Sequence, residues 1–405
     1  MAYLFLLTLL LAPTYAIRFK LGGLPANLLM IWVFLFWLIF FFYLLAGKNI
    51  KSFFSSPINK SVLIGTGLFF ISGLVSLFVK GLSREKIGQF IVLFLQPISL
   101  FFIGNYLLQK FPNLKKYLLS AIYFALAAAG LLAIIQYFSL WSLPMAFWGN
   151  SNEPKRAVSF FVHPNFYALW CAPLLAFVLP EALSNFKLKI SRLQSTDAPA
   201  DGGQVNLKLL AWGLGLIGLI LSLSRAGWLG FGFATLVYLI VAADKNIRKI
   251  AGVIAVVLVV IIISVPNLRW RFTLPFYGEK SAVSRLSLWQ TGIKGIKESP
   301  VFGLGLTGFS RNWERLNTDK GLTDAHNFPH NIFLDLWVET GLLGLISFTS
   351  LCFYLIYFGI KNRANLLKLG VSLFLIALIF QGMVDNPYFK NDLALVFWTI
   401  LAFAI

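Results

Sequence analysis

Stretches of apolar residues separated by short polar connectors run from one end of the chain to the other. Each stretch is close to the ~20 residues that an α-helix needs to cross a hydrocarbon layer of ~30 Å. Backbone groups in contact with lipid must satisfy their own hydrogen bonds, so we expect every stretch to be helical. The pattern predicts an all-α polytopic membrane protein with about 12 transmembrane helices. The predicted spans are residues 2–17, 28–46, 62–79, 88–108, 118–138, 166–183, 208–224, 226–243, 250–265, 331–358, 366–384 and 391–405.

One connector, Pro266–Pro329, is far longer than the others. Connectors of this length usually carry function or are disordered, and this one is not low in complexity. Apolar residues recur at helical spacing among its basic residues, at Leu286, Leu288, Trp289, Ile293 and Ile296. This spacing predicts an amphipathic helix on the membrane surface. The chain is therefore expected to form one membrane domain, with helices in 1–265, a large outer loop in 266–330 and further helices in 331–405.

The composition supports the membrane class, because 59% of the residues are hydrophobic and only 12% are charged. Soluble domains are about half apolar and about a quarter charged. These values exclude a disordered chain and most soluble folds. Cys171 and Cys352 both lie in apolar stretches, so no disulfide framework is expected.

The net charge of +19 could suggest a nucleic-acid partner, but the basic residues lie mostly in the connectors. The connectors that would lie inside carry more Lys and Arg than the short outer ones, so both termini are expected inside and Pro266–Pro329 outside. No nucleic-acid partner is expected. The first apolar stretch has no Lys or Arg before it and is expected to be retained as a span.

All three histidines, His163, His326 and His330, fall in predicted outer segments. Pro329 suits the first turn of a helix, which would place His330 at a helix amino terminus. The helix dipole there favours a neutral imidazole, which can act as a general base. Alternatively, His330 merely caps the helix. A metal site shared by His326, His330 and Asp324 is less favoured, because Pro329 interrupts the helical spacing that such a pair needs.

Two arginines are candidates for binding an anion. Arg225 lies between two apolar stretches that leave almost no room for a loop, so it should stand at the tip of a tight hairpin or inside the protein near the outer surface. Arg285 begins the amphipathic stretch. Together with a helix amino terminus, they would suit a phosphate group. The alternatives are an arginine that reaches lipid headgroups at position 225 and a solvated charge at position 285.

Other polar motifs are less specific. Gly303–Gly308 matches GxGxxG, but no βαβ pattern surrounds it, so a glycine turn is expected instead of a nucleotide site. The chain has no P-loop, so ATP is not indicated. Asp335 and Glu339 lie four residues apart on one helix face, where they could hydrogen-bond inside the bundle or relay a proton.

The chain resembles the superfamily of O-antigen ligases and O-antigen polymerases of bacterial inner membranes. The main match is His330-Asn331, nine residues, and then Gly341-Leu-Leu-Gly344, with Glu339 where the family often has an acidic residue. Three weaker matches keep the family's order, namely Arg156 with His163-Pro-Asn165, Ser222–Leu229 around Arg225, and Arg285–Trp289 followed by Pro300, Gly303, Gly305 and Phe309.

The resemblance implies a GT-C-like glycosyltransferase that inverts the anomeric carbon and uses no metal or cofactor. The donor would be a glycan on a polyprenyl diphosphate such as undecaprenyl diphosphate, and the acceptor a lipid, glycan or protein at the outer face of the inner membrane. Arg225 and Arg285 would neutralise the diphosphate, and His330 would deprotonate the acceptor. The residues expected to bind substrate are Arg156, His163, Asn165, His326, Asn331 and Glu339.

Two departures from the family pattern stand out. Ala226 follows Arg225 where the family usually has glycine, and His326 lies four residues before His330 where some members have an offset of two. Within the family, we favour ligation of a finished glycan over polymerisation of repeat units, because the His-Asn motif is closest to the ligase branch.

Two other classes are possible. A secondary transporter would place its ionisable residues near the midplane on broken helices. A cell-wall polymerase of the shape-and-division family would depend on an outer-loop Asp such as Asp324.

Overall fold

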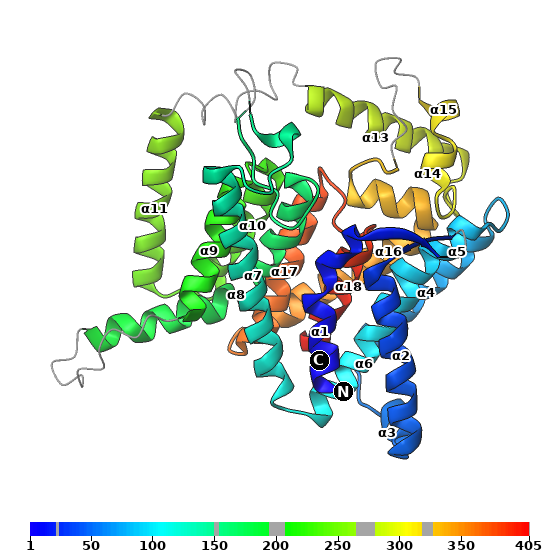
Figure 1. Ribbon diagram of the computed structural model, residues 1–405, viewed down its shortest axis with the longest axis horizontal. Helices are drawn as coiled ribbons and strands as arrows, with labels where there is room; N and C mark the ends of the chain where they lie inside the picture. Colours follow the sequence, from blue (N-terminus) through cyan, green and yellow to red (C-terminus); the bar gives the residue numbers. More distant parts are fainter. Residues whose placement is uncertain (22–23, 150–153, 194–206, 265–279, 318–326, 405) are drawn as a thin grey trace.

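The computed structural model of the chain describes residues 1–21, 24–149, 154–193, 207–264, 280–317 and 327–404. Helices make up nearly all of its regular structure and pack side by side as a bundle (Figure 1). The first part contains α1 (Ala2–Leu10), η1 (Ala12–Ala16), α2 (Leu28–Ala46), α3 (Ile50–Phe54), α4 (Lys60–Phe78), α5 (Arg84–Phe90), η2 (Ile91–Leu95), α6 (Gln96–Lys110), α7 (Leu114–Ser139) and η3 (Met145–Phe147). The second part contains α8 (Pro164–Leu193), α9 (Leu207–Leu221), α10 (Arg225–Val241), α11 (Lys245–Ser264), α13 (Lys280–Glu298), α14 (Gly308–Arg311), α15 (Trp313–Leu316), α16 (Ile332–Lys361), α17 (Leu366–Gly382), α18 (Asn391–Leu401) and η5 (Ala402–Ala404).

Within the described residues, each apolar segment predicted to be helical coincides with a helical segment. In the part of the chain that the structure describes, six helices are long and apolar enough to cross a membrane, namely Leu28–Ala46, Lys60–Phe78, Arg84–Lys110, Leu114–Ser139, Pro164–Ser184 and Ile332–Lys361. Shorter apolar helices include α9, α10 and α17. The helix content and these six candidates agree with the predicted all-α membrane class, and the figure of about 12 crossings stays a prediction.

A small antiparallel hairpin departs from the purely helical expectation. Strands β1 (Arg18–Leu21) and β2 (Leu24–Asn27) pair with Arg18 opposite Asn27 and Leu21 opposite Leu24. The sequence between them is Gly-Gly, a dipeptide that favours hairpin turns. This hairpin occupies the connector between the first two predicted spans.

Two predicted spans are not regular helices throughout. The fourth consists of α5, a short π-helical segment η2 and α6, in which Pro97 provides no backbone donor. The tenth, α16, is broken at Gly341, whose φ of 70° and ψ of −173° are not helical. This break in α16 lies inside the motif His330-Asn331, nine residues, Gly341-Leu-Leu-Gly344.

The carboxy-terminal helices form the centre of the bundle. In the described part of α18 every residue after Asn391 is buried, and α17 packs against both α8 and α10. Tyr388, in the connector between α17 and α18, donates a hydrogen bond of 2.7 Å to the Leu93 carbonyl oxygen and accepts one of 3.0 Å from Trp398. These contacts hold the connector of residues 383–390 against the helices of the bundle.

The two ends of the bundle differ. Helices α13, α14 and α15 lie together at one end, while both chain termini and α3 lie at the other (Figure 1). The described part of the long connector thus gathers over one end of the bundle.

Candidate active site

His330 lies just before α16 and pairs with a residue from the next connector. Its Nδ1 is 3.0 Å from Oδ1 of Asp385, between α17 and α18. The His330 side chain is 33% exposed and that of Asp385 only 4%, so the imidazole can meet a substrate while the carboxylate lies behind it. This arrangement resembles the carboxylate–imidazole pairs that orient a catalytic base.

The charge of Asp385 determines the role of His330. Burial alone would raise the pKa of the Asp385 carboxyl, but the hydrogen bond and charge of His330, together with Lys390, lower it to about 2. Asp385 is therefore ionised at neutral pH. An ionised carboxylate at Nδ1 favours the tautomer with its proton on Nδ1, which leaves Nε2 as a proton acceptor.

The backbone around His330 is held from both sides. His330 has a φ of 57°, a left-handed conformation that costs energy in a residue with a Cβ. The Asn331 side chain accepts hydrogen bonds from Phe333 (3.0 Å) and Leu334 (3.2 Å), which caps α16, and donates one of 2.9 Å to the Met383 carbonyl oxygen. Asn331, predicted to bind substrate, thus fastens the start of α16 to the connector that carries Asp385.

A second cluster contains three of the predicted site residues. Arg156 donates a hydrogen bond of 2.8 Å to Asn165 and another of 3.0 Å to the Ser222 carbonyl oxygen. The Asn165 backbone N–H donates to Nδ1 of His163 at 3.1 Å. Arg156 therefore joins the start of α8 to the turn between α9 and α10.

The two clusters act on each other electrostatically. Burial, followed by the positive charge of Arg156, lowers the pKa of His163 to about 4, and the charges of Asp385, Lys390 and His330 also contribute. The Lys390 ammonium lies directly over the ring of Phe166, in the first turn of α8. The connectors before α8 and before α18 therefore meet, and His163 is neutral at pH 7.

Arg225 is the first residue of α10 and follows a turn of only three residues after α9. The predicted tight hairpin is confirmed. In this turn Ser222 and Ser224 are buried, and Leu223 has a φ of 49°. Arg156, from the connector before α8, therefore contacts the turn that directly precedes Arg225.

Arg285 lies on α13, which packs against the segment before α16. One turn further along, Trp289 donates a hydrogen bond of 3.4 Å to the His330 carbonyl oxygen. Gly292 faces Pro329 so closely that an added Cβ would lie 3.1 Å from the proline ring. The structure therefore brings the helix that carries Arg285 to the backbone of His330.

The amphipathic helix itself is confirmed, but its buried face differs in part from the prediction. Leu288 and Ile296 are buried, whereas Leu286 and Ile293 are exposed. The inward face also contains Gly292, which permits the close approach to Pro329, so the helix is rotated relative to the predicted apolar stripe.

The Glu339 side chain lies inside the protein and is hydrogen-bonded to backbone. It is fully buried, and its Oε1 accepts a hydrogen bond of 3.0 Å from the Phe309 backbone N–H at the start of α14. Substrate binding was predicted for this residue, but burial leaves its side chain no exposed surface for a substrate. Asp335, one turn earlier, is also fully buried, and within the described residues its carboxylate oxygens have no hydrogen-bond partner.

The break in α16 is filled by the segment that follows α13. Leu304 N–H donates to the Val338 carbonyl oxygen at 2.7 Å, and Leu342 N–H donates to the Val301 carbonyl oxygen at 2.9 Å. Gly303 has a positive φ of 67°, which confirms the predicted glycine turn. Gly303, from the GxGxxG match, and Gly341, from the His-Asn motif, therefore both lie where the segment after α13 contacts the break in α16.

Two predicted candidates cannot be placed, because His326 and Asp324 lie outside the described residues. Conversely, sequence reasoning missed Asp385 as a site residue and treated Lys390 only as an outer charge. The signal that could have revealed them is the polar run Asp385-Asn386-Pro387 between two apolar spans, at the same predicted face as His330.

Comparisons with known proteins agree with the sequence motifs. The family model described as O-antigen ligase matches residues 210–349. An uncharacterized protein of Haemophilus influenzae is 24% identical over 160 residues, which cover 35% of this chain and 40% of that protein. The exopolysaccharide production protein ExoQ of Rhizobium meliloti is 40% identical over 82 residues, or 18% of each chain. The matched part thus spans less than half of either relative. Residues 210–349, which match this family model, include Arg225, Arg285 and His330, and the match supports the resemblance to the O-antigen ligase and polymerase superfamily.

Proposed function

We propose that this protein is a glycosyltransferase that moves a glycan from a polyprenyl-diphosphate carrier to an acceptor hydroxyl at the outer face of the bacterial inner membrane. The observation that carries the proposal is the pair of His330 and Asp385 at 3.0 Å, with the histidine inside the segment that matches the O-antigen ligase family. About 12 spans with 266–330 as the outer loop would place this pair on the outer side.

In the proposed reaction, Nε2 of His330 removes the proton of the acceptor hydroxyl. The oxygen then attacks the anomeric carbon of the donor sugar, and the bond from that carbon to the diphosphate oxygen breaks with inversion. Neutral alcohols are poor nucleophiles, so this step needs a base. Asp385 would stabilise the imidazolium that forms, as buried carboxylates do in other hydrolases and transferases.

Arg225 and Arg285 would bind the diphosphate as it leaves. Guanidinium groups bind phosphate oxygens in bidentate geometry, and fixed positive charges stabilise charge that develops during a reaction. Removing one such donor commonly lowers the rate by about 10²–10³. The energy would come from the donor's phosphate ester, without metal or cofactor.

The remaining predicted residues would have two kinds of role. Arg156, His163 and Asn165 would line the substrate side of the α9–α10 turn, next to Arg225. Asn331 and Glu339 would act as positioning residues, since their side chains hold the start of α16 and of α14. His326 stays a predicted substrate-binding residue.

We favour the ligase reaction, in which a finished glycan is transferred once, because the His330-Asn331 motif is closest to the ligase branch of the superfamily. The second candidate is a polymerase of exopolysaccharide repeat units. The similarity to ExoQ, an exopolysaccharide production protein, favours this alternative. The two reactions share their chemistry and differ only in the acceptor.

A transfer assay with the purified full chain would test the proposal. The donors would be polyprenyl-diphosphate oligosaccharides, supplied with hydroxyl acceptors and without metal or nucleotide. We expect glycan transfer and release of polyprenyl diphosphate, both strongly reduced in Arg225→Ala and Arg285→Ala and unchanged in Lys116→Ala, an exposed lysine on α7.

The product pattern separates the two candidates. A single added glycan indicates a ligase, and a ladder of repeat units indicates a polymerase. Transfer that survives both arginine substitutions would contradict the proposed diphosphate site.

A further inference from the structure

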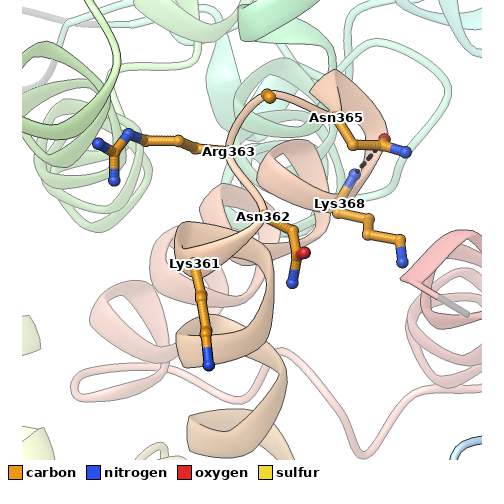
Figure 2. A pocket seen from close by; sticks show the side chains of 6 residues that line it. Lys361, Asn362, Arg363, Asn365 and Lys368 are labelled. Atoms are coloured by element: carbon orange, nitrogen blue, oxygen red, sulfur yellow. Dashed lines mark hydrogen bonds between the residues drawn. The ribbon is translucent and has the colours of Figure 1, made fainter.

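A pocket with positively charged walls lies at the turn between α16 and α17, away from the candidate active site. Its lining consists of Lys361, Asn362, Arg363, Ala364, Asn365 and Lys368. Lys361, Asn362 and Lys368 border the same open space, and Arg363 extends to the other side of the turn (Figure 2). The lining contains three cationic side chains and no acidic one.

The next feature of the pocket is how its cationic side chains are paired. Within the described part of the chain, Lys361, Arg363 and Lys368 form no ion pair with an acidic residue. The Lys361 ammonium lies 5.8 Å from the Tyr357 ring centroid and the Lys368 ammonium 4.6 Å from that of Phe358. Aromatic rings direct both ammonium groups but leave their hydrogen-bond donors available to an anion.

The walls of the pocket are the end of α16, the start of α17 and the turn between them. Asn362 donates a hydrogen bond of 2.8 Å to the Phe358 carbonyl oxygen at the end of α16. Asn365 caps α17 by accepting hydrogen bonds from the backbone N–H groups of Leu367 (3.1 Å) and Lys368 (3.2 Å). The cations therefore stand on two helix ends joined by a short, hydrogen-bonded turn.

The surroundings of the pocket indicate the source of the anion. On α16, Phe353 is 59% exposed and Tyr357, one turn before Lys361, is 62% exposed. Exposed aromatic rings that precede basic residues at the end of an apolar helix are typical of the level of lipid headgroups. Basic pockets between membrane helices bind anionic headgroups.

We propose that this pocket binds the phosphate group of an anionic phospholipid, held between Lys361, Lys368 and the Asn362 amide. The site is independent of glycan transfer, and its ligand is a structural lipid of the membrane that surrounds the bundle.

Native mass spectrometry of the detergent-solubilised full chain tests this proposal. Phosphatidylglycerol and phosphatidylcholine with the same acyl chains would be titrated, and inorganic phosphate would be added as a competitor. We expect phosphatidylglycerol to bind about 30-fold more tightly than phosphatidylcholine, since Lys361 and Lys368 would each add roughly 1 kcal/mol of attraction. Phosphate in the millimolar range should not displace it.

The double variant Lys361→Gln/Lys368→Gln should lose this preference, with about 30-fold weaker binding of phosphatidylglycerol. The matched control is Lys48→Gln/Lys116→Gln, which removes the same charge from exposed lysines elsewhere on the chain and should bind as the wild type does. The single variants Lys361→Gln and Lys368→Gln should each bind phosphatidylglycerol about 5-fold more weakly, and they provide the test if the double variant does not fold. Equal losses in both double variants, equal binding of the two lipids, or displacement by phosphate would overturn the proposal.

Discussion

The tautomer and orientation of the His330 ring depend on a carboxylate that lies 55 positions further along the chain. Asp385 accepts from the His330 imidazole and also from the Asn386 backbone N–H at 2.8 Å, so its own position is fixed. The neighbouring His163 has the opposite character, because burial and Arg156 keep it neutral. One site thus contains a histidine paired with a carboxylate and another that acts only as a neutral hydrogen-bond acceptor.

The neutral state of His163 predicts a pH-dependent stability. The folded protein protonates this side chain only near pH 4, whereas the ordinary pKa is 6.5, so the unfolded chain binds the proton first. Stability should therefore fall as the pH decreases from 6.5 towards 4. Thermal unfolding in detergent at pH 7 and pH 4.5 measures this loss. His163→Asn keeps a hydrogen-bond acceptor without a titrating ring and should lose less, and an equal loss in both proteins would contradict the assignment.

Because the Glu339 side chain is buried and accepts a backbone hydrogen bond, we expect its shape to matter more than its charge for stability and activity. Glu339→Gln retains an oxygen that can accept from the Phe309 N–H, so transfer activity should stay within about 5-fold of the wild type. Glu339→Ala leaves that N–H without its partner and should lower both the thermal stability and the activity. If Gln is as damaging as Ala, the carboxylate takes part in the reaction and the structural role is wrong.

The break in α16 joins two elements of the site. The segment of residues 301–304 supplies backbone partners to Val338 and Leu342, where the helix cannot bond to itself. It also connects α13, which carries Arg285, to the helix that begins after His330. The break therefore fixes the position of the outer segment over the bundle.

A methyl group at the break should be poorly tolerated. Gly341 has a φ of 70°, and an added Cβ would lie 2.5 Å from the Val301 carbonyl oxygen. We expect Gly341→Ala to destabilise the protein by about 2 kcal/mol or more, through backbone strain and steric overlap. Gly67→Ala is the matched control, because a Cβ there meets nothing within 4 Å and alanine favours the α4 helix. Equal melting temperatures for the two variants would refute the role of the break.

At the scale of the whole molecule, periodicity was enough to locate the helices. The segment predicted at 28–46 is α2 with the same bounds, because 19 apolar residues in sequence leave few alternatives. The break at Gly341 could not be predicted in this way, since an isolated glycine in an apolar stretch is usually tolerated in a helix. The partnership of His330 and Asp385 was also missed, because no periodic pattern links residues from different connectors.

The two ends of the bundle should face opposite sides of the membrane. Glu314 on α15 and Lys116 on α7 are both exposed, and the native Cys171 and Cys352 are buried. Single Glu314→Cys and Lys116→Cys variants can therefore be labelled without removing the native cysteines. In intact spheroplasts, an impermeant maleimide should label position 314 and should reach position 116 only after permeabilisation. The reverse pattern would contradict the proposed orientation of the site.

The initial rate of polyprenyl-diphosphate release by the wild type, His330→Ala and Asp385→Asn would show whether the His330–Asp385 pair supplies the catalytic base. Loss of the base should lower the rate by about 10²–10⁴. Asp385→Asn should lower kcat by about 10² or more with little change in KM, because the amide stabilises neither the tautomer nor the imidazolium. Both variants should therefore be impaired, while the exposed-surface variant Lys116→Ala should not be. Wild-type rates in His330→Ala would contradict this role of the pair.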